Sequence, residues 1–135
     1  MDQKTLVAEQ LDIGMKFLEV AEKHLNIAAA VWIYRQATED WWLYVVTPEL
    51  ESQHLKDVRL KLTVAQIEFR NPWIDQCHVT PVGLDDPVAV QSIEIKDRHP
   101  DEKVIEYPVT YFAKMGVENV YIYGDAALPH RVTAS

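Results

Sequence analysis

Apolar residues recur at steps of three and four positions in two long segments, from Lys4 to Leu25 and from Thr47 to Asn71. This spacing places apolar side chains on one face of a helix and is typical of amphipathic helices. Thr47-Pro48 supplies a capping hydroxyl and a proline at the first helical position, and the proline after Asn71 restricts that residue and ends the second run. The pattern therefore predicts two long helices, the second carrying His54 on its apolar stripe.

Between these segments, aromatic and aliphatic side chains alternate on both sides of the polar turn 36–40. Alternation with a period of two residues is typical of β-strands, so Ala30 to Thr47 predicts a β-hairpin. Three shorter strands are expected at Gln76–Val82, Val104–Ala113 and Val117–Tyr123, the last two joined by a turn that contains Gly116. Asp86-Pro87 predicts a short helix that runs to about Ile93.

These elements predict an α+β fold in the order αββαβαββ. The strand, long helix and strand from Trp41 to Val82 form a β-α-β unit, whose two strands run parallel in one sheet. We expect a mixed, mostly antiparallel sheet with the helices packed on one face. The expected organisation is a single domain over residues 1–124 with a C-terminal tail over residues 125–135.

The strands also predict a sheet face rich in aromatic rings, which is the main candidate binding or interface surface. The rings alternate with aliphatic residues in the hairpin and return near the C-terminus; they are Trp32, Tyr34, Trp42, Tyr44, Tyr121 and Tyr123. Tyr and Trp are enriched at protein interfaces, so either a second copy or another protein fits this face. The alternative is that a helix of the same chain covers it, because large exposed apolar patches are uncommon on monomers.

The charge balance restricts the possible partners. Thirteen Lys and Arg oppose 21 Asp and Glu, which gives a net charge of −8. Such a field repels phosphate backbones and anionic membranes, so nucleic acid and membrane partners are not expected. The longest apolar run, Ile27 to Tyr34, is too short to cross a bilayer, and the lone Cys77 agrees with a reducing compartment, so we expect a cytoplasmic protein.

One constellation has the residue types of a metal-dependent nuclease, namely Asp86 followed by Glu94 and Lys96. Carboxylates bind Mg²⁺, and a lysine assists attack on phosphate. The spacing is loose and the acidic surface opposes DNA, so a solvated helix end is the favoured interpretation. The five histidines lack the spacing of a zinc site, and no metal or cofactor is expected.

Three segments, Ala30–Tyr34, Trp41–Pro48 and Val120–Tyr123, resemble small uncharacterised bacterial α+β proteins of similar length. The resemblance implies a bacterial cytoplasmic protein and transfers no catalytic residue.

Three functional hypotheses follow. The favoured one is a non-enzymatic interaction or accessory protein that self-associates through the aromatic sheet face or the first helix. The second is a Mg²⁺-dependent nuclease or other hydrolase that uses Asp86, Glu94 and Lys96. The third is an inhibitor or immunity-type protein whose acidic face binds a basic partner.

Overall fold

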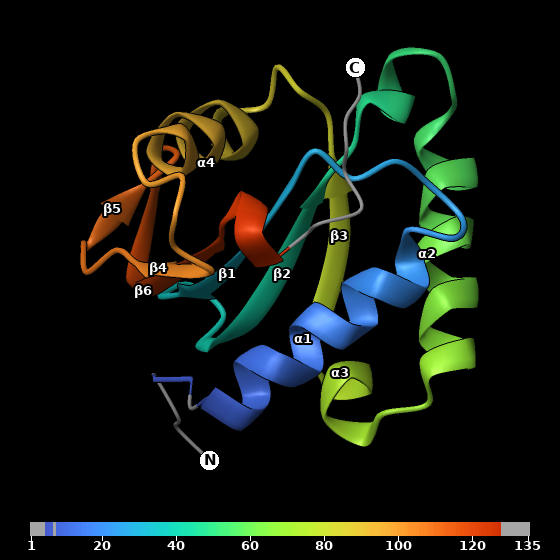
Figure 1. The fold of residues 1–135 in the computed structure, drawn as a ribbon, viewed down its shortest axis with the longest axis horizontal. Helices are drawn as coiled ribbons and strands as arrows, with labels where there is room; N and C mark the ends of the chain where they lie inside the picture. The colour runs from blue at the N-terminus through green and yellow to red at the C-terminus, as the bar shows by residue number, and fades with distance from the viewer. Residues whose placement is uncertain (1–4, 7, 128–135) are drawn as a thin grey trace.

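The computed structural model describes residues 5, 6 and 8–127 and contains a mixed six-stranded sheet with helices on both sides (Figure 1). The helices are α1 (Ala8–Ala21), α2 (Leu55–Phe69), α3 (Pro72–Gln76) and α4 (Pro87–Asp97), with 3-10 helices η1 (Pro48–Glu51) and η2 (Asp125–Ala127). The strands are β1 (Ala29–Arg35), β2 (Asp40–Val46), β3 (His78–Val82), β4 (Val104–Glu106), β5 (Tyr111–Phe112) and β6 (Met115–Tyr123). The α+β class is confirmed.

The strand order is β3-β2-β1-β6-β4, and β5 pairs with β6 beside this path. β2 and β3 are parallel neighbours, joined through η1, α2 and α3, which confirms the parallel β-α-β unit. The remaining pairs are antiparallel.

The register of the first hairpin differs from the expected one. Arg35 pairs with Asp40, so the connecting loop holds the four residues 36–39 and Asp40 belongs to β2. Shortening a loop by one residue moves every side chain of the following strand to the opposite face. The single aromatic face was therefore a wrong prediction: Trp32 lies opposite Leu43, and Ile33 lies opposite Trp42.

Each face of the sheet has its own core, so the prediction that the helices pack on one face was wrong. One core joins Trp32, Leu43 and Tyr123 to side chains of α1, α2 and α3. The other joins Ile33 and Val120 to Val88 and Ile95 of α4. Figure 1 shows α1, α2 and α3 on one side of the strands and α4 on the other. Both strand faces are apolar, and each needs a covering layer.

The second long helix is divided. Thr47 caps η1 by accepting a hydrogen bond from Glu49 N, and α2 begins only at Leu55. His54 is the residue before α2 and is exposed, so its predicted place on the apolar stripe was wrong. The run ends at Phe69, two residues before Asn71, and the Asn71 side chain caps α3 by accepting from Trp73 N and Ile74 N. The first helix ends at Ala21 rather than at the expected Leu25. Its expected start, Lys4, lies outside the described residues.

The C-terminal hairpin turns at Ala113 and Lys114 rather than at Gly116, which belongs to β6. Both turn residues have a positive φ, 52° and 69°. Positive φ at both central residues is the pattern of a type I′ turn, which matches the twist of antiparallel strands. The expected strand Val104–Ala113 is divided into β4 and β5.

The edge strand β3 contains a proline. Val82 O accepts a hydrogen bond from Thr47 N at the end of β2, so the backbone groups of Val79 and Pro81 face the open edge. Proline has no N–H to donate there, which agrees with its preference for edge strands.

The first residues of the expected tail, 125–127, form structure that contacts the rest of the chain. Asp125–Ala127 form η2, Ala127 is buried, and Asp125 binds Lys96 of α4. The remainder of the expected tail, residues 128–135, is outside the described residues.

Candidate functional site

Four of the six predicted aromatic residues belong to the core on the α1 side of the sheet and offer no surface to a partner. Trp32, Tyr34, Tyr121 and Tyr123 are all less than 5% exposed. Trp32 Nε1 donates to Tyr123 Oη at 2.9 Å, and Tyr123 Oη donates to Leu11 O of α1 at 2.6 Å. Burial raises the pKa of the Tyr123 hydroxyl far above its ordinary value. These rings join the sheet to its own first helix.

The other two aromatic residues, Trp42 and Tyr44, lie on the opposite face in a group that we call the Trp42 ladder: Arg35, Asp40, Trp42, Tyr44 and His78. The Trp42 ring stacks on His78 at 4.2 Å and on Tyr44 at 6.0 Å. Arg35 lies 4.7 Å from the centre of the Trp42 ring, and its guanidinium donates to Tyr44 Oη at 3.3 Å. Three neighbouring strands thus fix one polar aromatic group, in which Tyr44 is buried and Trp42 and His78 reach the surface.

Asp40 orders the polar side of the ladder. Its Oδ2 lies 2.7 Å from His78 Nε2, and its Oδ1 accepts from Trp42 Nε1 at 3.0 Å. Partial burial raises the pKa of Asp40, but hydrogen bonds from Thr38, His78 and Trp42 outweigh burial and hold the pKa below its ordinary value. Burial raises the pKa of Tyr44 despite the nearby Arg35. Asp40 is therefore a charged carboxylate that orients the His78 imidazole.

Cys77 and His78 do not form a nucleophile and base pair. Cys77 Sγ donates to Trp73 O at 3.2 Å, whereas His78 binds Asp40. Burial and the nearby Asp40 charge raise the pKa of Cys77 to about 12. The thiol is the protonated, weakly nucleophilic form at neutral pH.

A second surface feature lies on α2 and was missed in the sequence. The inner face of this helix buries Val58, Leu62 and Ala65. Its outer face carries Leu60, Val64 and Ile67, which are 61%, 36% and 62% exposed. Their steps of four and three residues place them in one row, which we call the α2 stripe. A second apolar periodicity, offset from the buried one, was the signal in the sequence.

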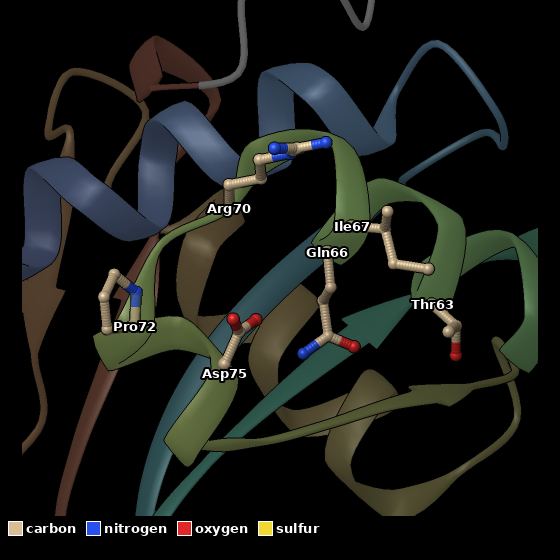
Figure 2. Close-up of a pocket in the computed structure, with 6 residues that line it drawn as sticks. All are labelled: Thr63, Gln66, Ile67, Arg70, Pro72 and Asp75. Carbon is tan, nitrogen blue, oxygen red and sulfur yellow. The ribbon is translucent and has the colours of Figure 1, made fainter.

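A groove continues the α2 stripe toward α3. It has a volume of about 500 Å³ and is lined by Thr63, Gln66, Ile67, Arg70, Pro72 and Asp75. Figure 2 shows Ile67 and Gln66 on α2 at one side of this groove and Pro72 and Asp75 at the other. Arg70 has a φ of 53°, the left-handed conformation that ends α2 and turns the chain into α3. The end of the stripe is therefore a hollow rather than a flat helix surface.

An ion pair and a histidine–carboxylate contact order two charged side chains beside the stripe. Lys61 Nζ lies 2.8 Å from Glu49 Oε1, and His24 Nε2 lies 2.9 Å from Glu68 Oε1. Lys61 and Glu68 are seven residues apart and so lie on the same flank of α2.

The predicted nuclease residues are not brought together. Asp86 caps α4 through a 2.8 Å bond from Val88 N, and Glu94 lies eight residues along the same helix, about 12 Å by helical rise. Lys96 is buried and binds Asp125 at 2.8 Å. Within the described part of the chain, no three His, Cys, Asp or Glu side chains are grouped to hold a metal ion. The helix places these residues too far apart for one metal site.

Comparison with protein-family models, curated proteins and solved structures gives no match to this chain. The fold defines its class, an α+β protein with a mixed six-stranded sheet. Over residues 5, 6 and 8–127, no helix is long and apolar enough to span a bilayer.

Proposed function

We propose that this protein is a non-enzymatic interaction protein that pairs with a second copy of itself through the outer face of α2. The observation that carries the proposal is the α2 stripe, in which Leu60 and Ile67 remain 61% and 62% exposed. Apolar side chains in a helical row are typical of surfaces that bind another helix. Burying them contributes about 25 cal/mol for each Å² removed from water.

The arrangement of the stripe favours a second copy as the occupant. Leu60 lies one turn before Val64 and Ile67 lies one turn after it, so the row is nearly symmetric about Val64. A copy of α2 related by a two-fold axis perpendicular to the helix runs antiparallel and presents the same side chains in reverse order. The Ile67 end of each row lies beside its groove, which offers room for an apolar side chain of the copy.

Charge complementarity supports the same pairing. In an antiparallel pair, one flank of α2 faces the same flank of the copy, with the order of its residues reversed. Lys61 then lies near Glu68 of the second copy, and Glu68 near the copy's Lys61. Both side chains are already ordered by Glu49 and His24, so little side-chain entropy is lost on pairing.

Sedimentation equilibrium tests the proposal. The wild-type chain is expected to form a dimer at micromolar concentrations, and Leu60→Glu with Ile67→Glu is expected to give a monomer with an unchanged circular dichroism spectrum. Val90→Glu is the matched control, because Val90 is 56% exposed on α4 and lies outside the stripe. A wild-type monomer at high micromolar concentration would remove the proposal.

A charge exchange tests the antiparallel orientation. Lys61→Glu is expected to weaken the dimer about tenfold or more by placing like charges together, and adding Glu68→Lys is expected to restore most of the affinity. Failure of the double variant to recover, with a normal unfolding curve, rules out this orientation.

A further inference from the structure

A second surface, independent of α2, has the features of a small-molecule site. A cleft of about 420 Å³ lies between α4 and residues 107–114. Val90, Tyr107 and Tyr111 give it an apolar and aromatic wall, and Glu94, Arg98 and Lys114 give it charges. Val90 and Tyr111 are 56% and 63% exposed, and the volume falls in the range of about 300–1,000 Å³ of ligand sites.

The charge of the cleft is opposite to that of the molecule. Two cations, Arg98 and Lys114, oppose one carboxylate, Glu94, in a chain with a net charge of −8. Among the described residues, none of these three groups takes part in an ion pair, although Arg98, the C-cap of α4, follows Glu94 by four residues. Their charges are free to act on a ligand, and a positive cleft in an acidic protein concentrates anions.

The turn that carries Lys114 supports a role for its side chain. Ala113 and Lys114 both have a positive φ, a conformation that glycine adopts with less strain than any residue with a Cβ. The turn is held against α4 because Ala113 N donates to Gln91 Oε1 at 3.0 Å. Backbone strain of this kind is often found at binding sites. Glycine at position 114 would relax the turn but would remove the ammonium group from the cleft.

We propose that this cleft binds a small monocarboxylate with an aromatic or other apolar body. The guanidinium of Arg98 binds the carboxylate through paired hydrogen bonds, and Lys114 adds a second positive charge. The apolar body packs against Tyr107, Tyr111 and Val90. Glu94 repels a second negative charge, so the cleft favours a monoanion over a phosphate dianion.

Isothermal titration of the full chain with phenylacetate, phenylacetamide and phenyl phosphate tests this proposal. Phenylacetate is expected to bind at least about tenfold more tightly than the neutral amide, because charge-assisted hydrogen bonds are lost in the amide. Phenyl phosphate is expected to bind more weakly than phenylacetate. Equal affinity for phenylacetate and phenylacetamide, or no saturable binding of phenylacetate at millimolar concentration, would overturn the proposal.

Three variants locate the site. Arg98→Gln is expected to weaken phenylacetate binding about tenfold or more, whereas Glu94→Gln is expected to strengthen it severalfold by removing the repelling charge. Arg59→Gln on α2 is the control and is expected to leave the affinity unchanged. Weakening by Glu94→Gln, or an equal effect of Arg59→Gln and Arg98→Gln, would contradict the assignment.

Lys114→Gly separates the ligand role from a structural one. This variant is expected to raise the urea midpoint of unfolding by relaxing the turn, and to weaken phenylacetate binding by removing the ammonium group. An unchanged affinity would remove Lys114 from the site. Because the cleft lies apart from α2, its failure would leave the proposed dimer untouched, and a monomeric protein would leave the cleft untouched.

Discussion

Gly14 shows how the absence of one side chain allows α1 to meet the sheet. A Cβ at this position would lie 2.3 Å from Tyr123 Oη and 2.8 Å from Trp32 Nε1. Both atoms are fixed, because Tyr123 bonds Leu11 of the same helix and Trp32 bonds Tyr123. The backbone of α1 can approach these two rings only through a glycine.

Gly14→Ala is therefore expected to destabilise the protein by about 2 kcal/mol or more, although alanine is the better helix former by about 1 kcal/mol. Urea unfolding followed by tryptophan fluorescence measures the change. Gly83→Ala is the control, because its Cβ would first meet the movable Asp85 side chain at 3.2 Å. Equal loss of stability in the two variants would show that the contact with Tyr123 and Trp32 is unimportant.

Cys77 is expected to react slowly in the folded protein. Its pKa of about 12 leaves very little thiolate at pH 8, where an ordinary cysteine is substantially ionised. Iodoacetamide should therefore alkylate the native protein at least about a hundredfold more slowly than the urea-unfolded chain.

Asp40→Asn separates the two causes of this slow reaction. Removing the nearby negative charge lowers the pKa of Cys77 while leaving the burial of the thiol in place, so native alkylation is expected to accelerate. Mass spectrometry of timed samples gives both rates. An Asp40→Asn rate identical to the wild-type rate would leave burial as the sole cause.

At the scale of elements, β2 is a strand whose register the sequence pattern does not determine. A core layer covers each face of β2: Leu43 and Val45 are fully buried on one face, and Tyr44 is 6% exposed on the other. Both registers therefore place apolar side chains against apolar neighbours, so alternation alone does not decide the register. The observed register places Arg35 opposite Asp40, an opposite-charge pair that favours it, although the two side chains bind Tyr44 and His78 rather than each other.

The outer face of α2 was missed for a different reason. The inner residues Val58, Leu62 and Ala65 satisfy the expected helical period, so the fold needs no second apolar row. Leu60, Val64 and Ile67 are exposed, and their role in association is the proposal made above, which the packing of one chain does not require. The cleft beside α4 was also missed. Its turn at Ala113 and Lys114 lacks the Asn-Gly sequence that usually marks a turn of this type, so the turn was not predicted at these residues.

Glu49 connects three segments and is expected to make stability depend on pH. It accepts from Asn26 N at 2.7 Å, from Gln53 at 3.0 Å and from Lys61 at 2.8 Å. Burial raises its pKa, but the bonds from Lys61 and Asn26 outweigh burial, so the folded pKa lies below the ordinary value of 4.5. The unfolded chain then takes up the proton first as the pH falls.

The contribution of Glu49 to stability is thus complete above about pH 5 and is lost as the pH falls through its folded pKa. Glu49→Gln is expected to lower the urea midpoint at pH 6 and to flatten its decline between pH 5 and pH 3. Glu51→Gln is the control, an exposed residue of the same 3-10 helix. Parallel midpoint curves for the wild type and Glu49→Gln would contradict this account.

At the scale of the whole molecule, the sequence predicted the order of the main elements and the parallel β-α-β unit, because local periodicity and chain connection determine them. It did not predict that α4 covers the second face. That arrangement depends on which strands become neighbours in the sheet, and β1 meets β6 across more than 80 residues of sequence. Long-range pairing of this kind has no local signal.

Pro81 on the edge strand sets a limit on how this protein can grow into larger assemblies. A chain that adds strands to a sheet edge needs backbone donors there, and β3 lacks the one at Pro81, while β4 and β5 have only three and two residues. Open-ended stacking through the sheet is therefore disfavoured. The proposed contact between two copies of α2, related by a two-fold axis, buries the α2 stripe of both chains at once. Assembly by that proposed route would therefore end at two chains.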